Sequence, residues 1–406
     1  MIPFSPPRID QKIIDEVIDT LRSGWITTGP KTKLFERKLA EFCGVSSVLC
    51  ISSATAGLHM ILKWYGIKEG DEVILPAYTF SATANVIIHT GAKPVFVDVK
   101  SDDLTINIKE VEKAITTRTK AIIPVDFAGY PVDYNGLNDL VHRDDVKNLF
   151  QAETEIQKKM GRILILSDSA HSLGAVYYGK RTGSLTDVSV FSFHAVKNLT
   201  TGEGGAIAFN MPSPFNNQSL YSFFNVYALH GQDKDALSRN TTGGWKYDVL
   251  FAGFKANMTD ILASLGLVEI DRYENDTLVK FRKIFDKYST ELKKYNWAEL
   301  PIYKSTTRTS SYHIYPLRIR NINEKQRDKI IQKIFDKGVS VNVHFRPVPS
   351  LTYYRNLGYN ADIYPVSMDA YQREITLPAF YDLTDEDMMT IINAVTLSVK
   401  EVLEND

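Results

Sequence analysis

Short apolar runs alternate with helical patterns from residue 48 to residue 209. The runs show little alternation between apolar and polar side chains, which is typical of strands that are buried on both faces of a sheet. Because helical patterns connect most of them, the sequence predicts an α/β fold built on a mostly parallel seven-stranded sheet. The predicted strands are residues 48–53, 72–75, 94–99, 120–125, 163–168, 188–193 and 204–209.

An amphipathic helix is predicted ahead of this sheet, with Asp10 as its N-cap and Gly24 at its C-terminal end. The loop at 24–30 then carries Trp25 and two threonines between glycines, and a packed loop anchor explains the tryptophan as well as a functional role does. The apolar face of the helix consists of Ile13, Ile14, Val17, Ile18 and Leu21.

The pattern changes near residue 257 to a long helical stretch that continues to about residue 288. Such a helix commonly bridges two domains, and a chain of 406 residues is expected to form two. We therefore predict a large domain with an N-terminal arm at 1–256, and a bridging helix with a smaller α+β domain at 257–406. The later elements are a strand at 311–319, a helix ended by Gly338, a strand at 339–345 and a final helix after Thr384, with Asp387 completing a capping box.

The segment at about 141–162 is long and charged, and it lies between the fourth and fifth predicted strands. Leu149, Ile156 and Met160 are spaced to line one face of an amphipathic helix. We interpret the segment as a peripheral elaboration of the sheet.

Composition narrows the function classes. The chain has 47 basic and 48 acidic side chains, so it gives no electrostatic indication of binding to nucleic acid or to an anionic membrane. The absence of a signal-like start and of a long apolar stretch predicts a soluble, cytoplasmic protein. Two cysteines, Cys43 and Cys50, cannot build a disulfide framework, and the histidines lack metal-ligand spacing, so no metal site is predicted.

Lys197 and Asp168 suggest a cofactor. Lys197 follows the sixth predicted strand and Asp168 ends the fifth, so both belong to the edge where an open α/β sheet binds its ligands. Pyridoxal phosphate needs an amine that forms a Schiff base with its aldehyde, and an anion that keeps its pyridine nitrogen protonated. Taken alone, a lysine is usually a solvated surface group and a strand-end aspartate is usually a turn or cap residue. Their shared position favours the cofactor interpretation.

Other polar and aromatic residues follow the same strand ends. The run at 53–57 leads into a helix and would offer backbone N–H groups and the Thr55 hydroxyl to a phosphate, although an ordinary N-cap is the alternative. Phe80 follows the second strand, where it could stack on a cofactor ring or belong to the core. His171 and His194 flank the proposed site.

These residues lie in segments that resemble the DegT/DnrJ/EryC1/StrS family of sugar aminotransferases, a branch of the fold type I pyridoxal phosphate enzymes. The resemblance extends over nearly the whole chain, and its central block at 191–205 is highly specific. The segments are SGWITTGPKTKLFE (23–36), SSATAGLH (52–59), GDEVILPAYTFSATAN (70–85), SDSAHSLGA (167–175), FSFHAVKNLTTGEGG (191–205), GFKANMTD (253–260) and VNVHFRP (341–347).

The resemblance implies a role for each matching residue. Lys197 is the Schiff-base and catalytic lysine, and Asp168 is the partner of the pyridine nitrogen. The chain departs from the family at Phe80, where relatives often have tryptophan, and in the insertion at about 141–162. The remaining implied roles are phosphate binding for Thr55, Ala56 and Ser192; ring stacking for Phe80; a position near the ring for His171; a contact with the neighbouring subunit's phosphate for Asn257; and substrate contacts for Trp25, Thr27, Thr28, His194 and His344.

The activity that the resemblance implies is transfer of an amino group from L-glutamate to the C4 ketone of a nucleotide-linked (UDP or dTDP) 4-keto-6-deoxy sugar, for surface polysaccharide or glycan biosynthesis. It also implies at least a homodimer with shared active sites, and ping-pong kinetics because two substrates share one site. Lys197 argues against the relatives that carry histidine there and dehydrate their substrate. A C3-aminating or cyclitol aminotransferase, and a non-catalytic module that binds pyridoxal phosphate, remain alternatives.

Overall fold

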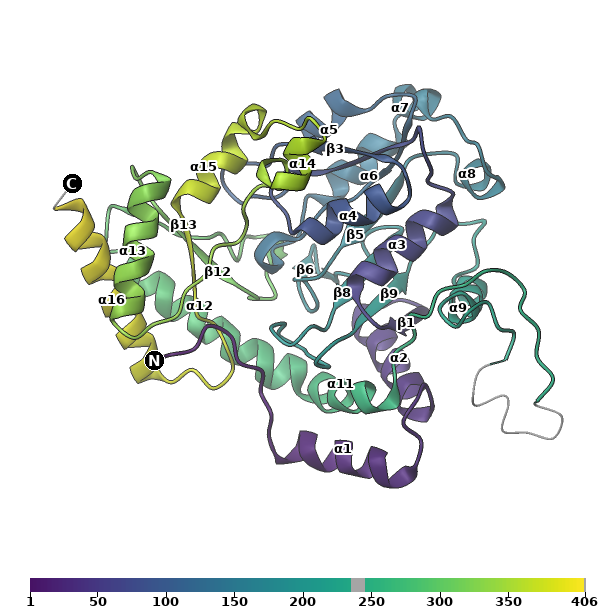
Figure 1. Ribbon diagram of the computed structural model, residues 1–406, viewed down its shortest axis with the longest axis horizontal. Helices are drawn as coiled ribbons and strands as arrows, with labels where there is room; N and C mark the ends of the chain where they lie inside the picture. The colour runs from purple at the N-terminus through teal and green to yellow at the C-terminus, as the bar shows by residue number, and fades with distance from the viewer. Residues whose placement is uncertain (235–244, 405–406) are drawn as a thin grey trace.

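The computed structural model describes residues 1–234 and 245–404. A seven-stranded sheet lies at its centre, in the order β1-β9-β8-β5-β4-β2-β3, and each predicted strand is present with ends shifted by up to three residues (Figure 1). All neighbouring strands are parallel except at β9, which is antiparallel to both β1 and β8, so the predicted mostly parallel sheet is confirmed. The strands are β1 (Ser47–Ile51), β2 (Glu72–Pro76), β3 (Lys93–Val97), β4 (Thr119–Ile122), β5 (Leu164–Asp168), β8 (Val188–Ser192) and β9 (Gly205–Phe209).

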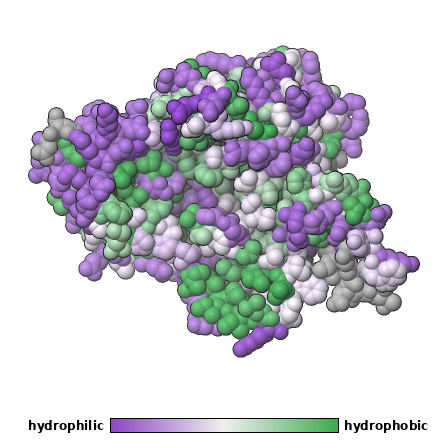
Figure 2. Space-filling model, viewed as in Figure 1, coloured by the Kyte–Doolittle hydropathy of each residue, from purple (hydrophilic) through white to green (hydrophobic). Residues whose placement is uncertain are grey.

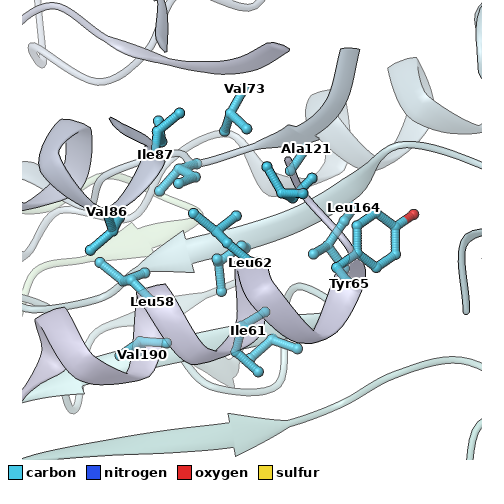
Figure 3. Packing of buried hydrophobic residues seen from close by; sticks show 14 of the residues in the cluster. Leu58, Ile61, Leu62, Tyr65, Val73, Val86, Ile87, Ala121, Leu164 and Val190 are labelled. Atoms are coloured by element: carbon cyan, nitrogen blue, oxygen red, sulfur yellow. The ribbon is translucent and has the colours of Figure 1, made fainter. Parts of the chain in front are cut away.

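Both faces of the sheet are buried, which explains the absence of apolar and polar alternation in its strands. In β2, Val73 and Leu75 pack into the cluster that contains α3 (Ala54–Tyr65) and α4 (Ser81–His89) (Figure 3). Ile74, between them, belongs instead to the cluster on the opposite face, with α6 (Tyr134–His142). A third cluster joins β1, β8 and β9 to α2 (Pro30–Cys43) and α11 (Asp260–Arg272).

The first helix, α1 (Gln11–Ser23), begins and ends as predicted. The Asp10 side chain accepts a hydrogen bond from the Ile13 N–H, and Gly24 adopts a left-handed conformation with φ of 73°. Only part of its apolar face is buried in the chain: Ile13 is buried, whereas Ile14, Ile18 and Leu21 are 41%, 36% and 53% exposed. Figure 2 shows a hydrophobic patch over α1, the helix that carries these exposed side chains.

The long helix that was predicted from residue 257 is present as three joined pieces. After α11, a π-helical turn (Tyr273–Thr277) leads into α12 (Leu278–Leu292). This helix reaches a second core, whose buried members come from residues 281–402. The division at residue 256 stays a prediction. The core includes a small sheet of β10 (Ala298–Glu299), β12 (Tyr315–Ile319) and β13 (Glu374–Leu377), with α13 (Glu324–Asp336) and α16 (Asp385–Leu403), whose Thr384 and Asp387 form the predicted capping box.

The predicted strand at 339–345 is wrong. The segment makes only isolated bridges, from Val339 to Ile2 and from Asn342 to Thr376 in β13. The pairing with β13 ends there because the next available N–H, that of His344, donates to the Glu374 side chain instead of to backbone. The predicted strand at 311–319 is also shorter than expected, since only its second half forms β12.

The insertion at 141–162 forms two short helices, α7 (Asp144–Leu149) and α8 (Glu155–Met160), so the single amphipathic helix is a wrong prediction. The buried Lys120 explains the break, because its ammonium donates to the Gln151 carbonyl and lies 3.3 Å from a carboxylate oxygen of Glu153. These contacts hold the connection in a non-helical path. Across the described residues, every helix is too short or too polar to span a bilayer.

Candidate active site

A cavity opens beyond the carboxyl ends of several central strands, where the predicted cofactor residues lie. Segments that follow β1, β2, β5 and β8 supply one wall. The chain's N-terminal segment and residues from the second core close the other side. Lining residues include Phe4, Ser5, Thr55, Thr79, Phe80, Asp168, His171, Ser192, His194, Lys197, Glu203, His313, His344 and Phe345.

Lys197 lies in the connection between β8 and β9, and its backbone N–H donates to the His194 carbonyl. Its ammonium nitrogen lies 3.4 Å from Nε2 of His313. Burial lowers the pKa of Lys197 from 10.5 to about 8, and the negative charge of Asp168 partly opposes this shift. A substantial neutral fraction near pH 8 makes this amine a nucleophile.

Asp168 is a buried carboxylate at the end of β5. It accepts hydrogen bonds from the Thr83 hydroxyl at 2.8 Å and from the Ala170 N–H at 3.2 Å. Burial raises the pKa of Asp168, while these hydrogen bonds and the Lys197 charge act in the opposite direction. No side chain in the described ranges forms an ion pair with it, so the site suits a ligand that brings its own positive charge, such as a protonated pyridine nitrogen.

The start of α3 is an ordinary helix cap that borders the cavity. Ser53 is the N-cap, and its hydroxyl accepts the Ala56 N–H at 3.1 Å, so Ala56 is already bonded within the chain. Thr55 and Ser192 line the cavity beside it. Gly205 lies against this turn so closely that a Cβ atom there would be 2.6 Å from the Ala54 nitrogen. The open N–H groups of this first turn and the two hydroxyls fit a phosphate.

Several aromatic side chains line the same cavity as Lys197. The His171 ring stacks on Phe345, with centroids 5.8 Å apart, and its buried Nδ1 has no hydrogen-bond partner in the described part of the chain. Phe80 is the N-cap residue of α4 and is 60% exposed, and its ring centroid lies 6.0 Å from that of Phe345. An unpartnered ring nitrogen and an exposed aromatic at one cavity fit a planar polar ligand such as pyridoxal phosphate.

His313 is a site residue that the sequence analysis missed. The Asn198 amide donates to the Ser311 carbonyl at 2.7 Å, which leaves its oxygen to accept from Nδ1 of His313 at 3.0 Å. Nε2 of His313 therefore carries a lone pair toward Lys197. Burial and the charge of Lys197 lower the pKa of His313 well below its usual value, so the ring stays neutral.

Five predicted residues do not line the cavity of their own chain: Ala56, which lies beside it in the first turn of α3, and the four residues Trp25, Thr27, Thr28 and Asn257. The Trp25 indole donates to the Thr28 carbonyl at 3.1 Å, and the Asn257 amide donates to the Thr28 hydroxyl at 2.6 Å. Asp260 fixes this loop further by accepting three backbone N–H groups at residues 29–32. Trp25, Thr27, Thr28 and Asn257 are thus a preformed surface feature outside the cavity.

The two histidines expected near the substrate do line the cavity. His194 lies at its rim, 47% exposed, with Nε2 3.7 Å from the Glu203 carboxylate. His344 lies deeper, and burial lowers its pKa to about 4. Within the described ranges, no group of three or more His, Cys, Asp or Glu side chains is arranged to hold a metal ion.

The chain is similar to known sugar aminotransferases over its whole length. A sugar aminotransferase from Streptococcus pneumoniae, Spr1654, has been solved in PLP and PMP forms. The PMP form is 43% identical in sequence to this chain and superposes with a TM-score of 0.95, and the match covers 99% of this chain and 100% of that one. Helicobacter pylori PseC, an aminotransferase involved in the biosynthesis of pseudoaminic acid, is 28% identical with a TM-score of 0.86, covering 98% and 99%. The spore coat polysaccharide biosynthesis protein SpsC from Bacillus subtilis is 35% identical over 98% of this chain and 97% of that protein.

These similarities confirm the predicted fold type I architecture and the predicted pyridoxal phosphate cofactor. The model of the DegT/DnrJ/EryC1/StrS aminotransferase family matches residues 7–396. The chain therefore belongs to the DegT/DnrJ/EryC1/StrS family and is a pyridoxal phosphate-dependent sugar aminotransferase.

Proposed function

We propose that the protein transfers an amino group from L-glutamate to the C4 ketone of a nucleotide-linked 4-keto-6-deoxy sugar, with UDP or dTDP as the nucleotide, in surface polysaccharide or glycan biosynthesis. Family membership and the printed roles of SpsC and PseC support a carbohydrate pathway. The observation that carries the proposal is a buried lysine, with its pKa lowered to about 8, in one cavity with a buried carboxylate that forms no ion pair among the described residues.

Each cavity residue then has a role toward the cofactor. When bound, pyridoxal phosphate supplies an electron sink for the carbon that loses its proton. Lys197 would anchor the cofactor, and Asp168 would keep its ring nitrogen protonated. The proposed phosphate contacts are Thr55 and Ser192, which line the cavity, and Ala56, whose N–H would exchange its bond to the Ser53 hydroxyl for one to the phosphate. The proposed ring contacts are Phe80 and His171.

Lys197 also moves a proton once its amine is free. The amine accepts the proton that leaves the α-carbon of the donor, and it later returns a proton to C4 of the sugar. The Nε2 lone pair of His313, 3.4 Å away, accepts a hydrogen bond from the free amine and keeps it directed into the cavity. His194 and His344 line the cavity and are the proposed substrate contacts.

We propose that the active unit is a homodimer with shared active sites. Two observations support it: the apolar face of α1 leaves Ile14, Ile18 and Leu21 exposed, and the Trp25–Thr28 loop is held by hydrogen bonds yet lies outside its own cavity. A second copy would cover the apolar face. In this arrangement Asn257 reaches the cofactor phosphate of the neighbouring subunit, and Trp25, Thr27 and Thr28 reach its substrate.

Mixed dimers should recover activity from two impaired variants. Lys197→Ala damages the site of its own chain, whereas Asn257→Ala damages the partner's site at limiting cofactor. In a mixed dimer, one site receives an intact Lys197 from one chain and an intact Asn257 from the other. Random mixing should therefore restore roughly a quarter of the wild-type rate. Activity is measured after co-refolding, with each variant alone as control, and no recovery would show that each chain builds its site alone.

The substrate is tested with L-glutamate and a panel of nucleotide-linked 4-keto and 3-keto sugars, including UDP and dTDP forms. Product mass should show replacement of the ketone oxygen by an amine only with the 4-keto sugars. Amine gain only with 3-keto sugars or a cyclitol ketone would replace the C4 proposal by the alternative aminotransferase. A protein that binds cofactor but shows no absorbance change with any amino donor would be the non-catalytic module.

A further inference from the structure

A buried hydrogen-bond chain connects Glu374 with the cavity residue His344. Glu374 is the first residue of β13, and its Oε2 accepts the backbone N–H of His344 at 2.8 Å. The Thr376 hydroxyl donates to Oε1 of Glu374, and Nδ1 of His344 lies 2.9 Å from the same hydroxyl. Nε2 of His344 has no hydrogen-bond partner among the described residues, and the ring lines the cavity. Phe4 stacks on the ring with centroids 5.8 Å apart.

The direction of the hydrogen bonds that link Glu374, Thr376 and His344 depends on a single proton, because the Thr376 hydroxyl has only one hydrogen to donate. When Glu374 is ionised, Thr376 donates to it and must accept from Nδ1–H of His344, which leaves a lone pair on Nε2 facing the cavity. When Glu374 is protonated, Oε2 still accepts the backbone N–H, so the proton lies on Oε1 and donates to Thr376. The hydroxyl then donates to Nδ1, and the hydrogen of His344 is on Nε2.

The two forms differ by one proton and can be interconverted along the chain. A proton that arrives at Nε2 allows the Nδ1 proton to move to the Thr376 oxygen and the hydroxyl proton to move to Oε1. The net result is one proton taken up at Nε2 and held by Glu374, with His344 neutral before and after. A neutral ring fits the surroundings, because burial and the charge of Lys197 lower the pKa of His344 to about 4.

The groups around Glu374 act on it in opposite directions. The positive charges of Arg327 on α13 and Arg318 on β12 favour the ionised form of Glu374. Arg327 also donates to the Glu374 backbone carbonyl at 3.3 Å. The Tyr78 hydroxyl, which donates to the His344 carbonyl at 2.6 Å, stays protonated and neutral because burial raises its pKa. Complete burial is the largest effect, and it raises the pKa of Glu374 to about 8. Both protonation states are therefore accessible near neutral pH.

We propose that Glu374 and Thr376 are positioning residues that switch Nε2 of His344 between hydrogen-bond acceptor and hydrogen-bond donor. As an acceptor, Nε2 binds a sugar hydroxyl, and as a donor it binds a carboxylate of the amino-group donor. The inference rests on the proposed function, in which a sugar and an amino acid alternate in one cavity. A single side chain thereby serves two substrates of opposite hydrogen-bonding character.

The proton position is read directly by NMR on the holoenzyme labelled with ¹⁵N histidine, with His344→Gln to assign the signal. In the wild type, Nε2 should change from protonated to unprotonated as pH rises through the region of the Glu374 titration. In Glu374→Gln the amide donates to Thr376 while its oxygen accepts the His344 N–H, so Nε2 should stay protonated from pH 6 to pH 10. An Nε2 signal with the same pH dependence in both proteins would overturn the inference.

Kinetics give a second readout that a purely structural role would not produce. Glu374→Gln loses the acceptor form, so KM for the sugar should rise about three- to tenfold at high pH while KM for the amino donor does not rise. Thr376→Val should make the Nε2 state of His344 independent of Glu374, whereas Thr376→Ser, which keeps the hydroxyl, should preserve the dependence. This pair of variants keeps the test available if Glu374→Gln does not fold. Equal KM changes for both substrates would contradict the switch.

The outcome separates the inference from the proposed function. NMR of the holoenzyme needs no substrate, so the switch is measurable even if no sugar on the panel is aminated. Amination of the 4-keto sugars by the wild type, together with an Nε2 state that ignores Glu374, would overturn the inference alone. If the wild type aminates none of the sugars on the panel but its Nε2 state still changes with pH, only the proposed substrate is overturned.

Discussion

Substituting Lys197 with alanine should lower amino-group transfer by at least about three orders of magnitude, because the change removes both the cofactor anchor and the proton carrier. The wild-type amine has its pKa lowered to about 8 by burial, so its neutral, reactive fraction increases with pH and reaches one half near pH 8. Cofactor capture by cofactor-free protein should follow that dependence. Stopped-flow absorbance measures capture, and a coupled assay for 2-oxoglutarate measures turnover.

Two variants control this experiment. Lys197→Arg keeps a positive charge but offers no neutral amine at accessible pH, so it should be as inactive as the alanine variant. Lys180→Ala removes an exposed lysine and should leave both capture and turnover unchanged. Turnover that persists in Lys197→Ala, or a borohydride-trapped cofactor recovered on another peptide, would contradict the assignment of this lysine.

The second large effect is expected at Asp168, where Asp168→Asn should lower the rate about 10²- to 10³-fold. The substitution keeps the size of the side chain and removes the charge that keeps the pyridine nitrogen protonated. Since no described side chain forms an ion pair with Asp168, the substitution breaks no ion pair within the protein and affects only the proposed pair with the pyridine nitrogen. Single-turnover absorbance with L-glutamate isolates the half-reaction in which the electron sink is needed.

Thr83→Val is the matched control for Asp168→Asn. It removes the 2.8 Å hydrogen bond to the carboxylate while leaving the charge in place, so we expect a loss of less than about tenfold. If the two variants lost equal activity, orientation of the carboxylate and not its charge would explain its importance. A cofactor analogue that lacks the basic ring nitrogen should impair the wild type far more than Asp168→Asn.

The central sheet could be predicted from sequence because burial on both faces leaves a simple signal. Val73, Ile74 and Leu75 are all apolar although they point to two different cores. The convergence of Lys197 and Asp168 was predictable for a related reason, since the carboxyl ends of neighbouring strands meet at one edge of a sheet. The long helix from residue 257 was similarly clear from its apolar spacing.

The errors arise where side chains, rather than local patterns, decide the backbone path. The segment at 339–345 alternates like a strand, but the Glu374 carboxylate takes the His344 N–H and ends the pairing. The helix expected at 141–162 is interrupted because the buried Lys120 binds the intervening carbonyl at Gln151. His313 was missed because it lies within an apolar run, and its role depends on Asn198, which is 115 residues away in the sequence.

Some site residues cannot be placed by one chain alone. Trp25 and Thr28 belong to an internally bonded loop outside the cavity, and Asn257 donates to the Thr28 hydroxyl, so neither the sequence nor the local geometry shows what these residues contact in the active enzyme. Their proposed roles follow from family resemblance and require the partner subunit. The mixed-dimer experiment therefore tests a part of the site that the isolated chain leaves open.

The strand reversal at β9 has a practical consequence for enzyme engineering. Because β9 runs antiparallel to β8, backbone hydrogen bonds join the two ends of the connection that carries Lys197. The Phe193 N–H donates to the Gly204 carbonyl, and the Thr201 N–H donates to the Phe193 carbonyl, each at 2.9 Å. The exposed rim residues His194 and Glu203 are the immediate neighbours of the hydrogen-bonded residues Phe193 and Gly204. Combinatorial libraries for new acceptor sugars can therefore randomise this rim while the reactive amine keeps its anchorage.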